Sequence, residues 1–162
     1  MPTMSNQPGR TGAKLSAFFH LPGPERARLS QALMLIPLVS FGLKLFGFRR
    51  IYRLLDLWAP NPEGAPPAEL EQAHRIADLV GKAAWQGFYP VTCLPRSLSL
   101  LAILRRNKIP ARLCIGIRRS DDGIQGHAWV EVGQVSLLES EETIQQFSQI
   151  PLTNLNTGIK LD

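Results

Sequence analysis

Apolar residues recur at helical spacing through most of the chain before residue 107. They run almost without interruption from Leu33 to Phe48, and the amphipathic segment 48–58 follows with its arginines off the apolar face. The same spacing predicts a helix over about residues 67–88 and another from about Thr92 to Asn107. The polar residues before this pattern, 1–20, are expected to form a disordered tail.

After Pro110 the pattern changes to the character of strands. The chain there predicts three strands and then one short helix, over residues 111–117, 127–132, 135–138 and 141–147. Helices first and an antiparallel meander afterwards predict an α+β fold with a small antiparallel sheet.

Length and composition fit one globular domain. The chain has 162 residues, of which 44% are hydrophobic and 19% charged, and this excludes a disordered or fibrous protein. We expect a single domain over residues 21–162. Its parts are apolar and basic helices over 21–58 and a core over 67–162, with a proline-rich break between them.

The formal net charge of +5 is concentrated near the N-terminus. The first 58 residues hold only two acids, Glu25 and Asp56, against eight basic side chains: Arg10, Lys14, Arg26, Arg28, Lys44, Arg49, Arg50 and Arg53. A protein that binds nucleic acid along its whole length would not need this asymmetry, so we expect no nucleic-acid partner. Basic residues beside an apolar run favour a membrane surface or an acidic peptide instead.

The apolar run Leu33–Phe48 leaves three interpretations open. It has only sixteen residues and contains Pro37, Gly42 and Lys44, whereas a spanning helix needs about twenty apolar residues. We expect a buried or partner-facing helix, with a membrane-surface helix second and a true span third. The first twenty residues contain no apolar run of the signal-peptide kind. We therefore expect a cytoplasmic protein, with a peripheral position at the inner face of the membrane as the alternative.

The two cysteines predict neither a metal site nor a disulfide framework. Cys93 and Cys114 form no CxxC pair, and no His/Cys cluster has the spacing of zinc ligands. We expect no cofactor and no metal.

Cys93 and His127 are the candidate reactive pair. Cys93 lies at the predicted start of a helix, where backbone N–H groups and the helix dipole stabilise a thiolate. His127 opens a predicted strand. A histidine base close to a thiol makes the sulfur a nucleophile. A cysteine at a helix start followed by a histidine on a strand is the arrangement of papain-like and transglutaminase-like enzymes. Spacing alone also fits a buried cysteine and a structural histidine.

The residues around this pair resemble a known family. CLPRSL at 93–98, ARLCIGI at 111–117 and HAWVEV at 127–132 closely resemble, in that order and spacing, the leader peptidase of lasso-peptide biosynthesis. This is the protease half of the B protein, in the microcin-processing family with a transglutaminase-like core. The resemblance is strong over about residues 90–140 and weaker over the helices before them.

The resemblance implies a cysteine peptidase that removes the leader from a ribosomally made precursor peptide. It implies that Cys93 is the nucleophile and His127 the base. The third residue of the family is an Asp about twelve positions beyond the histidine, where this chain has Glu139. Its implied partners are the precursor peptide, a separate small leader-recognition protein and an ATP-dependent macrolactam synthetase.

The strand pattern leaves the third residue open. If the loop after the His127 strand is 132–134, His127 faces Glu139; if it is only 133–134, His127 faces Ser140 and Glu139 points away. We expect Glu139 to be the acid. The alternatives are Glu131, on the same strand face as His127, and the loop residues Asp121 and Asp122.

Two other functions compete with the peptidase. A non-catalytic adaptor that tethers the pathway to a membrane or transporter is suggested by the apolar run 33–48. An acyltransferase or transglutaminase would use the same thiol but transfer the acyl group to an amine.

Overall fold

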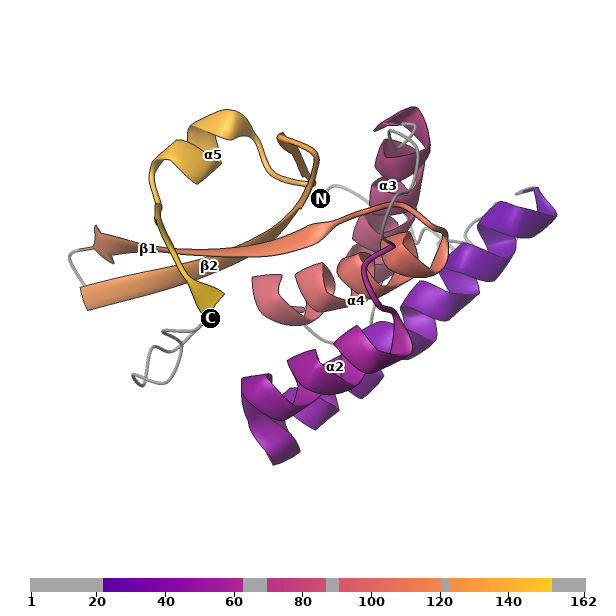
Figure 1. Cartoon of the computed structure of the whole chain (residues 1–162), viewed down its shortest axis with the longest axis horizontal. Helices are drawn as coiled ribbons and strands as arrows, with labels where there is room; N and C mark the ends of the chain where they lie inside the picture. The colour runs from indigo at the N-terminus through magenta and orange to yellow at the C-terminus, as the bar shows by residue number, and fades with distance from the viewer. Residues whose placement is uncertain (1–21, 63–69, 87–90, 121–122, 153–162) are drawn as a thin grey trace, which may run out of the picture.

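The computed structural model describes residues 22–62, 70–86, 91–120 and 123–152, and the predicted tail 1–20 lies outside these ranges. The elements, in chain order, are α2 (Gly23–Trp58), α3 (Leu70–Gln86), α4 (Cys93–Arg106), β1 (Arg112–Ser120), β2 (Gly123–Val132), β3 (Val135–Leu137), α5 (Glu141–Gln145) and β4 (Ser148–Ile150). The predicted α+β class is confirmed. The helices α2, α3 and α4 lie to one side of the strands, and α5 lies on the other (Figure 1).

The sheet has four antiparallel strands in the order β3-β2-β1-β4. The hairpin between β2 and β3 closes at Val132 opposite Val135, so its loop is Gly133-Gln134. The left-handed φ of 63° at Gly133 suits a residue without a Cβ. Of the two loops that the strand pattern left open, 132–134 and 133–134, the structure has the shorter one.

Helix α4 is the central element of the core. Every residue from Cys93 to Arg105 is buried except Arg96. The helix packs against α2, α3 and β2, and one buried cluster includes residues of all these elements. Arg105 fixes its C-terminal end, since Nη1 is 2.7 Å from Asp56 Oδ1 and Nε donates to the Ala111 carbonyl at 3.1 Å. These contacts hold the C-terminal end of α4 against α2 and against the segment that leads into β1.

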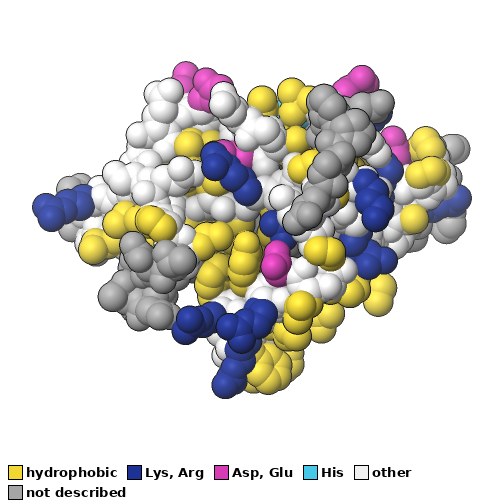
Figure 2. Space-filling model, in the orientation of Figure 1, with side chains coloured by type: hydrophobic (Ala, Val, Ile, Leu, Met, Phe, Trp, Pro, Cys, Tyr) yellow, Lys and Arg dark blue, Asp and Glu magenta, His cyan; other side chains and the backbone are white. Residues whose placement is uncertain are grey.

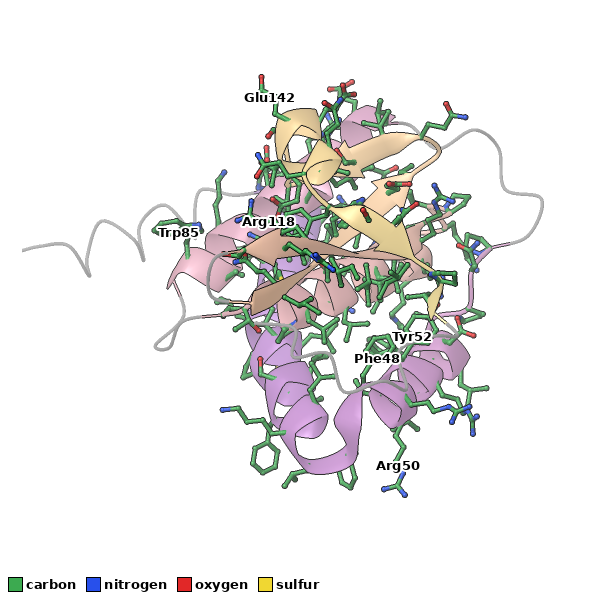
Figure 3. The ribbon with its side chains drawn as sticks, turned by 90° about the vertical axis from the view of Figure 1, so that its left-hand side faces the viewer. Phe48, Arg50, Tyr52, Trp85, Arg118 and Glu142 are labelled. Atoms are coloured by element: carbon green, nitrogen blue, oxygen red, sulfur yellow. The ribbon has the colours of Figure 1, made fainter. Side chains whose placement is uncertain are left out.

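Helix α2 folds back on itself at Gly47, whose φ of 76° and ψ of 168° are not helical. The two arms, 23–46 and 48–58, pack closely against each other. A Cβ on Gly42 would lie only 2.7 Å from Ile51 Cδ1, so this position needs a glycine. Figures 1 and 3 show the arms meeting at this bend. By length and composition α2 could cross a membrane, but one face of it is packed into the core. The expectation of a buried helix therefore holds for that face.

Candidate active site

Three side chains meet where α4 begins beside β2. Cys93 is the first residue of α4, His127 lies on β2, and Glu139 follows β3. The Ser97 hydroxyl donates to the Ala128 carbonyl at 2.9 Å. Because Ser97 is one turn after Cys93 and Ala128 is next to His127, this bond fixes the two reactive residues relative to each other.

The start of α4 suits an anionic sulfur. Thr92 precedes the helix in an extended conformation, and its side chain makes no capping hydrogen bond. The N–H groups of the first turn are therefore not taken up by a cap at the end of the helix where the dipole is positive. Cys93 is buried and is not in a disulfide.

The imidazole of His127 is held between a thiol and a carboxylate. Its Nε2 lies 3.4 Å from Glu139 Oε2, which is long for a hydrogen bond and makes this contact an ion pair. Nδ1 is then the nitrogen left to exchange a proton with sulfur. The interaction with Cys93, and then that with Glu139, raises the pKa of His127 from 6.5 to about 9, against the opposing effect of burial. At neutral pH the site therefore holds an imidazolium beside the sulfur, ready to donate a proton.

Glu139 reaches His127 by a route that the strand pattern did not predict. In the observed register a continuing strand would turn Glu139 away from His127. Instead β3 ends at Leu137, and Leu138 adopts a left-handed φ of 68° that redirects the chain. Leu138 packs against the core, and a Cβ on Gly81 of α3 would lie 3.1 Å from its Cδ2. Tertiary packing, not the hairpin, therefore directs Glu139 to the site.

Arg96 is the second cation on the Glu139 carboxylate. Its Nη2 donates to Glu139 Oε1, while Oε2 faces His127. Burial by itself would raise the pKa of the Glu139 carboxyl, but the contact with His127 and the charge of Arg96 outweigh it, so the pKa is lowered. The carboxylate stays ionised and can balance an imidazolium.

The alternative acid, Glu131, is engaged elsewhere. Its Oε1 accepts a hydrogen bond from Trp129 Nε1 at 2.9 Å, and its Oε2 accepts two from Arg112 at 2.9 and 2.6 Å. The structure thus places Glu139, rather than Glu131, beside His127. The other candidates, Asp121 and Asp122, lie outside the described residues.

Cys114 has the opposite environment from Cys93. It is buried on β1, and burial followed by the charge of Glu131 raises the pKa of its thiol to about 12. A thiol that stays protonated is a poor nucleophile, which leaves Cys93 as the candidate nucleophile. Among the described residues no group of three or more His, Cys, Asp or Glu side chains could hold a metal ion.

Phe147 and Arg96 lie at the site although neither is among the site residues expected from the sequence. Phe147 follows α5 and stacks on His127 with ring centroids 5.1 Å apart, and the guanidinium of Arg118 lies 4.9 Å from the Phe147 ring centre. No local signal marks Phe147, since its position depends on β4 pairing with β1. Arg96 could have been found, because it is three residues after Cys93 and so on the same helix face.

We expect His127 to titrate near pH 9 and the midpoint to fall in Glu139→Gln. Glu139 is one of the groups that raise this pKa, so removing its charge lowers it. NMR titration of the imidazole C–H signals measures the midpoint, and His127→Gln assigns the signal. Since the pKa in the folded state exceeds the ordinary 6.5, the stability contributed by this imidazolium is present below pH 6.5 and is lost as pH rises through about 9. A midpoint near 6.5 in the unchanged protein would contradict the described contacts.

Gly116→Ala is expected to destabilise the fold and to disturb the packing over His127. Gly116 lies opposite His127 on β1, and an added Cβ would be 2.8 Å from Phe147 Cβ and 3.0 Å from Trp129 Cη2. Such overpacking costs about 1–3 kcal/mol, measured as the free energy of unfolding in urea. Gly23→Ala is the matched control, because a Cβ there meets nothing within 4 Å. Equal stability of the two variants would show that Phe147 does not pack on this glycine.

Comparison with known proteins places the chain in a family. Residues 35–151 match the family model described as the transglutaminase-like superfamily. No curated protein matches the chain, and no solved structure does. The matched segment begins within α2 and includes Cys93, His127 and Glu139. Because the match covers more than half of the chain, the protein belongs to the transglutaminase-like superfamily, whose members include cysteine peptidases and acyltransferases.

Proposed function

We propose that the protein is a cytoplasmic cysteine peptidase that removes the leader from a ribosomally made lasso-peptide precursor. The observation that carries this proposal is the junction of Cys93, His127 and Glu139, made from three separate elements. The segments CLPRSL, ARLCIGI and HAWVEV, which resemble the lasso-peptide leader peptidases, supply the choice of substrate.

The reaction follows from the positions of the groups. In this proposal the Cys93 thiolate attacks the scissile carbonyl carbon, and the backbone N–H of Cys93 donates to the resulting oxyanion. Imidazolium at His127 gives its proton to the departing amine of the core peptide, which leaves the leader as a thioester on Cys93. Neutral His127 then takes a proton from water, whose oxygen attacks the thioester. The leader leaves as a carboxylic acid, and the thiolate and imidazolium are restored.

Cleavage is tested with a candidate precursor peptide taken from the neighbouring genes. The purified chain, mixed with the precursor and the small recognition protein, is expected to give two fragments whose masses sum to precursor plus one water. The same reaction with added hydroxylamine, a strong amine nucleophile, distinguishes hydrolysis from acyl transfer. A leader product formed only as an adduct of an added amine would assign an acyltransferase and overturn the peptidase proposal.

We expect the isolated chain to cleave its precursor poorly and the recognition protein to accelerate the reaction. Residues 23–58 and 70–86 are helical, so this part of the described chain offers no strand edge to which a leader could add. A tethered leader also gains effective concentration at the site, which is worth about 10²–10⁴-fold in binding. Single-turnover rates with and without the recognition protein measure this effect. Equal rates would remove the partner from the proposal.

A further inference from the structure

Helix α2 carries a second apolar face that nothing in the described chain covers. We call it the outer face, and it consists of Met34, Leu38, Phe41, Leu45 and Phe46. Between 54% and 76% of each of these residues is exposed. Met34, Leu38, Phe41 and Leu45 recur along one side of the helix, and Phe46 is the last residue before the bend, whereas the side with Leu35, Ile36 and Val39 is buried in the core. The core of the protein covers only the inner side of α2, so the outer face needs another apolar environment to cover it.

The second arm of α2 places three exposed arginines close to the outer face. Arg49, Arg50 and Arg53 follow directly after the bend at Gly47, and among the described residues none of them forms an ion pair. Figure 3 shows Arg50 pointing away from the molecule near the bend, whereas Phe48 and Tyr52 point inward. Figure 2 shows basic side chains beside hydrophobic ones along the same edge of the molecule.

Charge decides between the occupants that an apolar face could have. A second copy of the chain meeting this face would bring the two arginine clusters together, and Asp56, the acid on this arm, already pairs with Arg105. A spanning arrangement would pull the inner face of α2 out of the core. An anionic lipid surface satisfies both features, since acyl chains accept the apolar side chains and phosphates accept guanidinium groups.

We propose that the bend of α2 is a peripheral membrane anchor, which inserts the outer face into an anionic bilayer while Arg49, Arg50 and Arg53 bind lipid phosphates. The exposed Trp58 at the end of the second arm suits the same interface, where tryptophan is enriched. This surface is built from α2 and not from the catalytic residues, so the inference does not depend on the peptidase proposal. It would place the enzyme at a membrane while its site stays in water.

Vesicle flotation with the full-length chain tests the anchor. We expect binding to vesicles of phosphatidylglycerol and phosphatidylcholine, weaker binding at high salt, and little binding to phosphatidylcholine alone. Replacing Arg49, Arg50 and Arg53 with glutamine is expected to weaken binding to the anionic vesicles about 100-fold. The matched control replaces Lys82, Lys108 and Arg119 with glutamine. These are three exposed cations elsewhere that form no ion pair among the described residues, and the control is expected to bind like the unchanged chain.

The apolar half of the proposal needs its own variants. Leu38→Ser with Phe41→Ser is expected to weaken vesicle binding at least about tenfold. The control is Trp85→Ser with Ile124→Ser, which removes two exposed apolar side chains away from α2. A measurement on a chain without the serine substitutions guards against misfolding. Brominated lipid should quench the tryptophan fluorescence of the unchanged chain, and Trp58→Phe alone should remove most of that quenching.

Several results would overturn the anchor. Equal binding to neutral and anionic vesicles, or binding unaffected by either α2 variant, would remove it. Dimerisation in sedimentation equilibrium that Leu38→Ser with Phe41→Ser abolishes would assign the face to a second copy. If the unchanged chain does not bind vesicles, and Leu38→Ser with Phe41→Ser abolishes binding to the recognition protein, the outer face is a docking site for that protein. Resistance to alkaline carbonate extraction would assign a spanning segment.

Discussion

Cys93→Ala is expected to abolish precursor cleavage while leaving the protein folded. The thiolate is the attacking atom in the proposed reaction, and no other described side chain at the site can replace it as nucleophile. Loss of a nucleophile in a comparable triad lowers the rate about 10⁶-fold, so only background hydrolysis should remain. The change removes a single sulfur at the start of α4, and the Ser97 hydrogen bond to Ala128 still holds that helix to β2. Single-turnover cleavage and the free energy of unfolding measure the two effects separately.

Cys114→Ala is the matched control for the loss of a buried thiol. Cys114 is buried on β1, and its raised thiol pKa of about 12 keeps it protonated. We expect cleavage at the unchanged rate and a loss of about 1 kcal/mol in stability. A folded Cys93→Ala protein that still cleaves the precursor would overturn the thiol mechanism. Inactivity of a stably folded Cys114→Ala protein would show that the other thiol is the nucleophile.

The helical half of the fold could be predicted because its signals are local. Apolar periodicity predicted α3 and α4, and the predicted range from about Thr92 to Asn107 agrees with the observed helix Cys93–Arg106. The bend of α2 was partly visible, since the sequence separates an apolar run ending at Phe48 from an amphipathic segment. The turn itself depends on Gly47 and on the close contact of Gly42 with Ile51, which only the packed arms reveal.

Glu139 was indicated by the resemblance, at the acidic position of the family, while the strand pattern left its direction open. A three-residue loop would have turned it toward His127, and the observed loop has two residues. Glu139 is nevertheless beside His127, because Leu138 is left-handed and packs near Gly81, a residue 57 positions earlier in the chain. Local preference disfavours such a backbone at leucine, so the strand pattern alone would have turned Glu139 away from His127 in the observed register.

Phe147 and strand β4, which cover His127, were not predicted, because their positions also depend on contacts between distant segments. Strand β4 has three residues, Ser148 to Ile150, and its sequence shows no alternation that marks a strand. It exists because β1 offers an edge at residues 115–117. Its pairing brings Phe147 onto His127, so the aromatic contact depends on a pairing between distant segments.

The adaptor and the peptidase need not exclude each other in this structure. The adaptor hypothesis came from the apolar run 33–48, whose outer face lies on α2. The candidate site lies elsewhere, at the start of α4, on β2 and just after β3. A membrane anchor can therefore coexist with a complete triad on separate elements. Variants of α2 and variants of Cys93 should separate the two properties cleanly, because sites without shared contacts act independently.

Glu139→Gln is expected to slow the chemical step up to about 10⁴-fold, as the loss of an orienting carboxylate does in comparable triads. An amide cannot balance the imidazolium that carries the proton to the leaving amine. Its N–H group can also face Nε2, which favours the tautomer with the proton on Nδ1 and blocks proton transfer from sulfur.

Two further carboxylate variants make this result specific. Glu139→Asp keeps the charge with one methylene fewer and is expected to retain part of the activity. Glu131→Gln removes a carboxylate that contacts Trp129 and Arg112 rather than His127, so its single-turnover rate should change little. The rate must be measured with saturating recognition protein, so that chemistry and not binding is compared. If Glu131→Gln proves to be the crippled variant and Glu139→Gln cleaves normally, the carboxylate beside His127 in this structure is not the one that serves the reaction.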